Sequence, residues 1–270
     1  MNVSLRAGLH TASALSITVG MAVAIVAEDA LFGVSFERRD DYVRTWAKRV
    51  VHRLGIAVDV AGPETDTRLP RPGGTLLVSN HRSMLDVFMI LSLAGTRILA
   101  RGDMASWPGI GTIANLGGTL YVNRDDKRSR LAALTAIGRE LDAGRAISVF
   151  AEGTTFTDDT VRPFHPGAFA MVKRSGGVVL PVGIAYDPPA VYFGDEPFLE
   201  HLKNLVLTPN IRAAVTFGAP IAASTPNLVE SSREAVQALV HASRARLSAP
   251  QGVSGKCVAS RPKIARRTQR

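Results

Sequence analysis

From Ile56 onward, short apolar runs alternate with longer stretches in which apolar residues recur at helical spacing. Each short run is bounded by Gly, Pro or charged residues, as is typical of strands. The predicted strands are Ile56–Ala61, Thr75–Ser79, Arg97–Ala100, Thr119–Val122, Ala146–Phe150, Val178–Ala185 and Ile211–Phe217. The stretches between them predict helices at Met84–Leu93, Ser129–Ala143, Gly167–Arg174 and Asn227–Leu247. This alternation predicts an α/β domain, with a mostly parallel sheet flanked by helices, over residues 55–250.

The N-terminal segment has a different pattern. Ala7–Ala27 contains no formal charge, and a helix of that length nearly matches a hydrocarbon core of ~30 Å. Polar residues dilute its first half, so that only Leu15–Ala27 is strongly apolar. We favour a membrane span or re-entrant hairpin. Two alternatives remain. The segment is a cleaved signal peptide, with Arg6 before its apolar run and small residues near Ala27, or it is a buried helix.

Phe36–Leu54 reads as a basic amphipathic helix. Its apolar stripe consists of Val43, Trp46, Val50 and Leu54, and its basic residues Arg44, Lys48, Arg49 and Arg53 lie largely off that stripe. Such a helix suits a membrane interface, or it packs on its own domain as an ordinary surface helix. Basic residues directly after an apolar segment favour the cytoplasmic side. We therefore predict that residues 1–54 associate with the cytoplasmic face of the inner (plasma) membrane.

Composition and charge add exclusions. The chain has 270 residues, 46% of them hydrophobic, which excludes wholesale disorder. The single cysteine, Cys257, excludes a disulfide framework and a cysteine-based zinc cluster, and we expect no metal site. The net charge is +9, and residues 251–270 hold no acid but the basic residues Lys256, Arg261, Lys263, Arg266, Arg267 and Arg270. We read this tail as disordered, either a solvated charge run or a segment attracted to anionic lipid. Nucleic acid is not an expected partner, because the tail has no stacking aromatic.

The sharpest chemical signal follows the strand Thr75–Ser79. His81 stands at the carboxyl end of that strand, where parallel sheets form their ligand sites. Asp86 comes five residues later, and a bend into the next helix brings its carboxylate back to the imidazole. A histidine held in this way keeps its other nitrogen free as a base near neutral pH. The bland alternative is that Asn80 and Ser83 merely cap the helix and His81 bonds locally.

Three further segments carry weaker signals. Glu152 and Gly153 follow the strand Ala146–Phe150, where they suit a ligand or simply a turn. Arg124 ends another strand, where a guanidinium can grip a phosphate bidentately, although Asp125 and Asp126 offer a plain ion pair. Pro181 interrupts an apolar strand and marks an edge, a bulge or a bend. The chain has neither a Gly-x-Gly-x-x-Gly fingerprint opening a helix after the first strand nor a P-loop, which are the usual sequence signatures of dinucleotide- and nucleotide-binding proteins.

Together these segments resemble the glycerolipid acyltransferase family, whose best-known members act on 1-acyl-glycerol-3-phosphate. The family's first motif, Asn-His-x4-Asp, is matched by Asn80, His81 and Asp86. Its Gly-rich strand ending in Arg is matched by Gly118 and Arg124, and its Phe-Pro-Glu-Gly-Thr-Arg motif is matched in part at residues 150–154. Pro181 matches its fourth motif, an apolar strand with Pro. The order is right, and the matched span covers about residues 55–220.

The resemblance implies that His81 is the general base and Asp86 its orienting partner. A lyso-lipid hydroxyl would attack the thioester of an acyl-CoA or an acyl carrier protein, with no bound cofactor. The substrate-binding residues implied are Asn80, Arg101, Gly118, Arg124, Glu152, Gly153, Thr154, Thr155 and Arg162. Family members are membrane-associated, and membrane lipids are therefore expected partners.

Two departures bear on the acceptor. Ala151 replaces Pro, and Thr155 stands where members that recognise glycerol phosphate often carry Arg. A hydroxyl cannot replace a bidentate guanidinium at a phosphate, although Arg101 and Arg162 offer other cations. We narrowly favour 1-acyl-glycerol-3-phosphate as acceptor over lyso-ornithine lipid or another lysophospholipid. A thioesterase, with water replacing the lipid hydroxyl, and a non-enzymatic lipid-binding protein are the remaining alternatives.

Overall fold

The fold is built on a central sheet. The computed structural model describes residues 3–63, 71–107 and 110–249; the predicted tail 251–270 lies outside these ranges. Eight strands form one sheet in the order β1-β7-β6-β2-β5-β3-β4, with β8 pairing β6. Their bounds are β1 Ala57–Ala61, β2 Thr75–Ser79, β3 Arg97–Arg101, β4 Leu120–Val122, β5 Ala146–Phe150, β6 Val178–Asp187, β7 Arg212–Phe217 and β8 Ile221–Ala222.

The sheet is mostly parallel, as predicted. β2 pairs in parallel with both β5 and β6, and β3 pairs in parallel with β5 and β4. Only the side containing β7 is inverted, because β7 runs antiparallel to β6 and carries β1 parallel to itself. The carboxyl ends of β2, β5, β3 and β4 therefore meet at one edge of the sheet, where ligand sites of parallel sheets form.

Pro181 lies inside the sheet, in β6. On one side it pairs in register with Val78 of β2. On the other side β8 pairs only up to Val179 and β7 only from Val182. Pro181 thus falls in the gap between two partner strands, which is a local edge, where a proline interrupts no ladder on that side.

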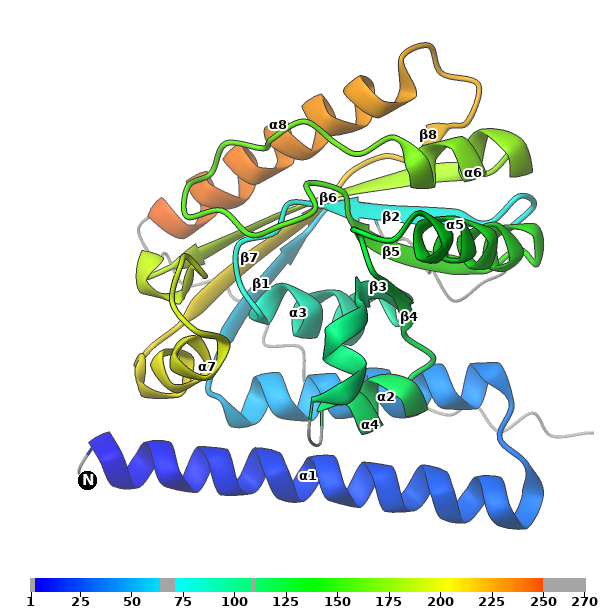
Figure 1. Ribbon diagram of the computed structural model, residues 1–270. Coiled ribbons are helices and arrows are strands. Elements are labelled where there is room, and N and C mark those ends of the chain that lie inside the picture. The colour runs from blue at the N-terminus through cyan, green and yellow to red at the C-terminus, as the bar shows by residue number, and fades with distance from the viewer. Residues whose placement is uncertain (1–2, 64–70, 108–109, 250–270) are drawn as a thin grey trace, which may run out of the picture.

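Helices cover both faces of the sheet (Figure 1). Successive side chains of a strand point to opposite faces. Leu77 accordingly packs with Met89 of α3 on one face, and Leu76 packs with Ile137 of α5 on the other. The covering helices are α3 Leu85–Ala94, α5 Lys127–Asp142, α6 Gly167–Ser175, α7 Phe198–Leu207 and α8 Leu228–Ser248. Sequence patterns predicted these helices except α7, and they missed the short α4 (Ile110–Leu116) and β8 as well.

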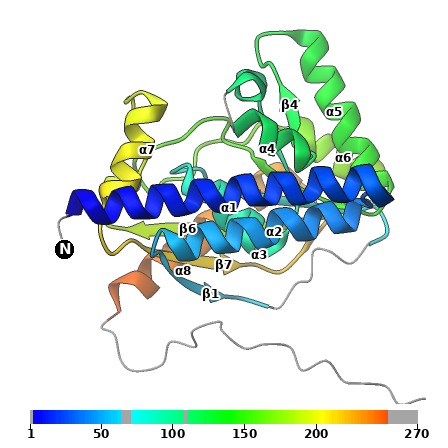
Figure 2. The ribbon, with the colours of Figure 1, turned by 90° about the horizontal axis from the view of Figure 1, so that it is seen from below.

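The two N-terminal helices form an antiparallel pair below the sheet (Figures 1 and 2). α2 (Phe36–Arg53) is capped at its N-terminus by Ser35, whose hydroxyl accepts the Arg38 N–H. Its apolar stripe, including Val43 and Val50, is buried against α3. Packing of this helix on its own domain is thus seen in the structure, and its docking at a membrane interface stays a prediction.

α1 (Val3–Phe32) packs on one side only. Met21 and Ile25 are buried, whereas Leu15 and Val23 remain more than 60% exposed. The window Ala12–Phe32 is long and apolar enough to cross a membrane. α1 is therefore not the buried core helix of a soluble domain, and its exposed apolar side indicates membrane association.

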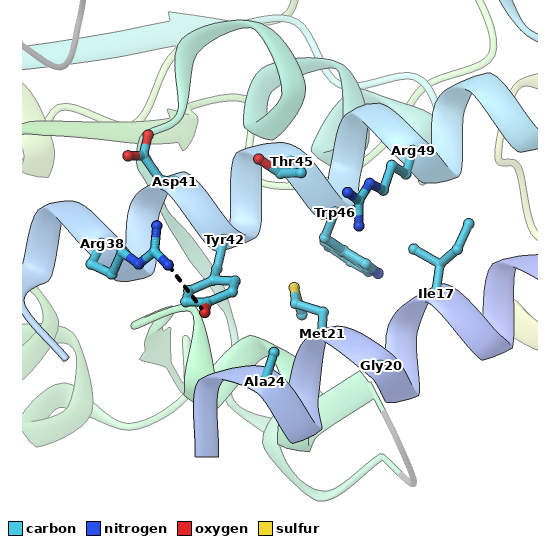
Figure 3. A pocket seen from close by; sticks show the side chains of 10 residues that line it. All are labelled: Ile17, Gly20, Met21, Ala24, Arg38, Asp41, Tyr42, Thr45, Trp46 and Arg49. Carbon is cyan, nitrogen blue, oxygen red and sulfur yellow. Dashed lines mark hydrogen bonds between the residues drawn. The ribbon is translucent and has the colours of Figure 1, made fainter. Parts of the chain in front are cut away.

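A pocket of about 450 Å³ lies between α1 and α2, which touch each other around it (Figure 3). Met21 from α1 and Tyr42 from α2 line it, and the Trp46 indole donates to the Thr18 hydroxyl at 2.9 Å. Beside this pocket, Glu28 holds Arg38 through a bidentate ion pair. These contacts fix α1 along α2.

Candidate active site

The site forms where β2 and β5 end side by side. Ser79 and Phe150, the last residues of the two strands, are paired in register. The chain continues from them into the loops that carry His81 and Glu152, so these two residues are neighbours although they are 71 positions apart. The His81 N–H donates to Oε1 of Glu152 at 3.0 Å. The structure thus brings the residues of the first and third motifs together at the sheet edge.

His81 and Asp86 form the predicted pair. Nδ1 of His81 lies 2.8 Å from Oδ2 of Asp86, and the imidazole stacks on the Phe150 ring with centroids 4.0 Å apart. The His81 side chain is 21% exposed and that of Asp86 is completely buried. An anionic carboxylate at Nδ1 selects the Nδ1–H tautomer. Nε2 makes no hydrogen bond within the described residues and retains its lone pair for a proton.

Asp86 is held by three further donors. The backbone N–H groups of Arg82 and Ser83 donate to Oδ2 at 2.5 and 2.9 Å. The Tyr186 hydroxyl donates to Oδ1 at 2.7 Å. Burial, with the Asp86 charge beside it, raises the pKa of Tyr186 well above its usual value, which keeps the hydroxyl a donor. Donors to an anionic carboxylate stabilise its charged form, and Asp86 is therefore fixed as an acceptor for His81.

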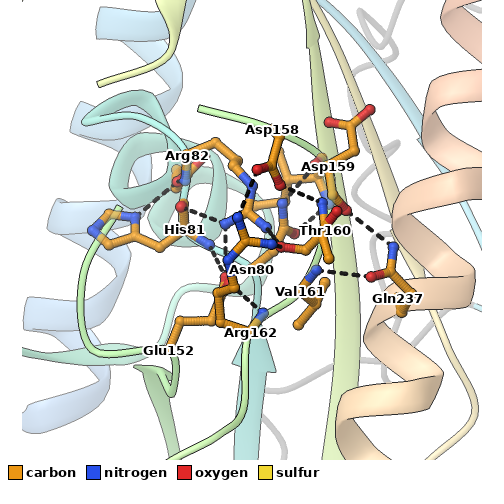
Figure 4. Close-up of polar contacts among 12 residues, drawn as sticks. Asn80, His81, Arg82, Glu152, Asp158, Asp159, Thr160, Val161, Arg162 and Gln237 are labelled. Atoms are coloured by element: carbon orange, nitrogen blue, oxygen red, sulfur yellow. Dashed lines mark hydrogen bonds and ion pairs between the residues drawn. The ribbon is translucent and has the colours of Figure 1, made fainter. Parts of the chain in front are cut away.

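A buried ion pair between Arg82 and Glu152 braces the loop (Figure 4). The guanidinium donates to Oε1 of Glu152 at 2.7 Å and to the carbonyls of His81 and Thr160 at 2.7 and 2.9 Å. Both side chains are completely buried. Removing one partner of such a pair strands an uncompensated charge. Sequence reasoning missed Arg82. The available signal was its position: a charged residue inside the Asn-His-x4-Asp motif, just after a buried strand.

Two residues predicted to bind substrate have their polar atoms occupied by the protein. Glu152 accepts at Oε2 from the Arg162 N–H as well as from His81 and Arg82 at Oε1. Asn80 is buried, and its amide exchanges two hydrogen bonds with the Ile184 backbone of β6. Both side chains thus tie together the loops around His81, and their binding of substrate stays a prediction.

Of the three predicted arginine cations, two are paired. Arg101 makes a bidentate ion pair with Asp103, and Arg162 pairs with Asp158 at 2.6 Å. Arg124 has no carboxylate partner among the described residues. Burial, with repulsion from the Arg101 charge, lowers the pKa of Arg124. Arg124 is thus the cation most available to an anionic group.

Gly153 lies against this cation. Its φ of +84° is a left-handed conformation, and an added Cβ would lie 2.7 Å from Nε2 of His165 and 3.6 Å from Nη1 of Arg124. Glycine is therefore required where the His165 imidazole and the Arg124 guanidinium converge. Thr154 is exposed and Thr155 half-buried in the same loop.

Gly118 lies apart from these residues. It precedes β4, whereas Arg124 follows it. Its φ is +69°, and an added Cβ would lie 3.2 Å from Nε of Arg97, at the start of β3. The structure places Gly118 in a turn at the opposite end of β4 from Arg124, and does not bring it to the other predicted site residues.

Comparison with known proteins bears on this geometry. The family profile described as Acyltransferase matches residues 59–185. A lyso-ornithine lipid O-acyltransferase of Pseudomonas aeruginosa is 30% identical over 207 residues, covering 74% of this chain and 78% of that protein. A 1-acyl-sn-glycerol-3-phosphate acyltransferase of Neisseria meningitidis serogroup B is 28% identical over 150 residues, covering 56% of this chain and 57% of that protein.

A solved structure has the same fold. The 1-acyl-sn-glycerophosphate (LPA) acyltransferase PlsC of Thermotoga maritima superposes with a TM-score of 0.69 at 20% identity, covering 93% of this chain and 100% of that chain.

Proposed function

This chain belongs to the acyltransferase family, and on that premise we propose that His81 is its general base and Asp86 the orienting carboxylate for acylation of a lyso-lipid hydroxyl. The observation that supports these roles is the 2.8 Å contact of Nδ1 with Asp86, which leaves Nε2 unbonded at the sheet edge. A base of this kind typically contributes about 10²–10⁴-fold to rate.

The proposed step is direct transfer. Nε2 of His81 removes the proton of the acceptor hydroxyl while the hydroxyl oxygen attacks the thioester carbonyl carbon. The ester C–O bond forms, the C–S bond breaks, and the imidazolium returns the proton to the departing thiolate. The donor is an acyl-CoA or an acyl carrier protein. A serine ester is not part of this route, because Ser83, the hydroxyl two residues from His81, is completely buried.

We propose lyso-ornithine lipid as the preferred acceptor, reversing the narrow preference that the sequence suggested. A phosphate monoester carries about two negative charges, whereas Asp103 and Asp158 already compensate Arg101 and Arg162. An amino-acid headgroup presents one carboxylate, which suits Arg124, the one predicted arginine without a carboxylate partner among the described residues. Two relatives named as lyso-ornithine lipid O-acyltransferases, at 30% and 31% identity, match this chain over 74% and 66% of its length.

We further propose that residues 1–54 hold the catalytic domain, 55–250, at the cytoplasmic face of the membrane. The exposed apolar side of α1 supports membrane contact. A thioester donor formed in the cytoplasm has to reach His81 from that side. Removing residues 1–34 should move the protein out of the membrane fraction, and a full-length protein that is freely soluble without detergent would contradict this assignment.

An acceptor panel tests the function. Purified enzyme is incubated with acyl-CoA or acyl carrier protein, alone and with lyso-ornithine lipid or 1-acyl-glycerol-3-phosphate, and both thiol and diacyl product are measured. We expect acceptor-dependent thiol release, faster with lyso-ornithine lipid. Equal thiol release without acceptor would identify a thioesterase. Acylation of 1-acyl-glycerol-3-phosphate alone would restore the phosphate acceptor and leave the role of His81 intact.

A further inference from the structure

A second imidazole–carboxylate pair lies behind the first. His201 on α7 is completely buried, and its Nδ1 lies 3.0 Å from Oε1 of Glu196. Its Nε2 faces the catalytic loop, 3.4 Å from both the Ser83 hydroxyl and the Met84 N–H. Nothing in the motifs pointed to His201, and the roles proposed for His81 and Asp86 do not use it.

Ser83, His201 and Glu196 are arranged like a hydrolase triad, yet they do not form one. A nucleophile has to reach a carbonyl carbon, and Ser83 and His201 are both 0% exposed. The Ser83 hydroxyl also accepts the Leu85 N–H at 3.3 Å. Ser83 and His201 therefore serve as hydrogen-bond acceptors for backbone N–H groups of the protein itself.

That backbone is the first turn of α3. The early N–H groups of a helix have no partner inside it and need an outside acceptor. Met84, at the N-cap of α3, provides no side-chain cap. Instead, the Met84 N–H donates to Nε2 of His201, and the Leu85 N–H donates to the Ser83 hydroxyl. Asp86, two residues beyond Met84, lies in this first turn and faces His81.

The tautomer of His201 follows from its surroundings. Burial lowers the pKa of His201, so the ring is neutral near pH 7 and carries one N–H. The carboxylate at Nδ1 holds that proton there, which leaves Nε2 as an acceptor. Glu196 is fixed in turn by the Gly194 N–H at 3.0 Å.

The same segment touches the loop at one further point, and it also packs against itself. The Phe193 N–H donates to the Arg82 carbonyl at 2.7 Å. The Phe193 ring stacks on the His201 imidazole with centroids 4.3 Å apart. Residues 193–201 thus dock on Arg82, Ser83 and Met84 in succession.

We infer that His201, oriented by Glu196, is a positioning residue that fixes the first turn of α3 and so keeps Asp86 in place against His81. This inference rests on the proposed function of His81 and Asp86. It predicts that the acceptor atom at Nε2, and not the ring as such, supports turnover.

Two substitutions separate that atom from the rest of the side chain. His201→Gln keeps an acceptor at the reach of Nε2, and His201→Asn keeps a polar group only at the reach of Nδ1. We expect His201→Asn to lower kcat about tenfold, equivalent to about 1.4 kcal/mol, with KM for donor and acceptor within about twofold. We expect His201→Gln to recover most of kcat. His241→Asn, an exposed histidine on α8, is the matched control and should keep wild-type kcat.

Hydrogen exchange provides a readout that does not depend on acyl transfer. Amides of the peptide spanning residues 80–86 should exchange faster in His201→Asn than in wild type or His201→Gln. Equal kcat and equal exchange in the two His201 variants, or a wild-type kcat in His201→Asn, would overturn the inference. An inactive wild-type enzyme would instead refute the proposed function, and exchange alone would then decide the positioning role.

Discussion

The two imidazole–carboxylate pairs have the same spacing and opposite burial. His81 and Asp86 are five residues apart, as are Glu196 and His201. In the first pair the carboxylate is 0% exposed and the imidazole 21% exposed. In the second the imidazole is 0% exposed and the carboxylate 26% exposed.

Burial therefore separates the roles of two chemically equal pairs. An imidazole with an open Nε2 can take a proton from a substrate, whereas one whose Nε2 faces a buried hydroxyl and a backbone N–H can only hold structure. A buried carboxylate with several donors is held in one direction by them. A partly exposed carboxylate shares its charge with water and contributes less.

The largest effect expected from this comparison is the loss of the open imidazole. His81→Ala should lower kcat about 10²–10⁴-fold, because no other base replaces Nε2. The thermal unfolding midpoint should change little, because the ring is partly exposed and the Asp86 carboxylate keeps its other donors. Wild-type turnover in a folded His81→Ala protein would remove His81 from the mechanism.

The carboxylates should rank next, with the buried one first. Asp86→Asn takes the charge away from Nδ1 of His81; losing that one charged hydrogen bond, worth about 1.5–3 kcal/mol, corresponds to a fall in kcat of about 10–100-fold. The unfolding midpoint should also drop, because one amide oxygen cannot accept from all the donors that now bond to the carboxylate. Glu196→Gln should cost less in both measurements. A larger loss of kcat in Glu196→Gln than in Asp86→Asn would reverse the comparison.

Substrate-facing groups should affect KM where positioning groups affect kcat. Arg124→Ala should raise the acceptor KM about 10–100-fold, because one charged hydrogen bond is worth about 1.5–3 kcal/mol. Arg124→Lys should recover only part, since the planar fork is lost. Arg162→Ala, which removes a cation already paired with Asp158, is the matched comparison and should change KM less. Equal effects at both arginines would exclude Arg124 as the headgroup anchor.

The smallest effect concerns a carboxylate with no imidazole beside it. Burial raises the pKa of Asp40 on α2 to about 6 from its ordinary value of 3.8. Protonated Asp40 thus stabilises the fold below pH 3.8, and this contribution is lost as the pH rises through about 6. Asp40→Asn should therefore raise the unfolding midpoint by an amount that grows from pH 4 to pH 7 and is then constant. A gain independent of pH would contradict this sign.

Local sequence pattern determined much of the scaffold. The strands Thr75–Ser79 and Ala146–Phe150 were predicted to the residue, because short apolar runs bounded by Gly and polar residues leave few alternatives. The contact of His81 with Asp86 was also predictable, since a loop-to-helix bend joins residues only five positions apart. The missed α7 is as long as the predicted α3, but its leucines do not form one core-facing stripe: Leu205 is buried, whereas Leu199, Leu202 and Leu207 are exposed.

Tertiary structure alone decided how the polar residues are used. Arg82 reaches Glu152 across 70 positions and His201 reaches Ser83 across 118, and no spacing rule joins such residues. Asn80 and Glu152 were read as substrate contacts, yet in the folded chain their polar atoms bond to backbone groups and to the Arg82 guanidinium. Sequence determines which groups a loop carries; whether such a group faces a substrate or supports its neighbours depends on burial, and burial exists only once distant segments have packed together.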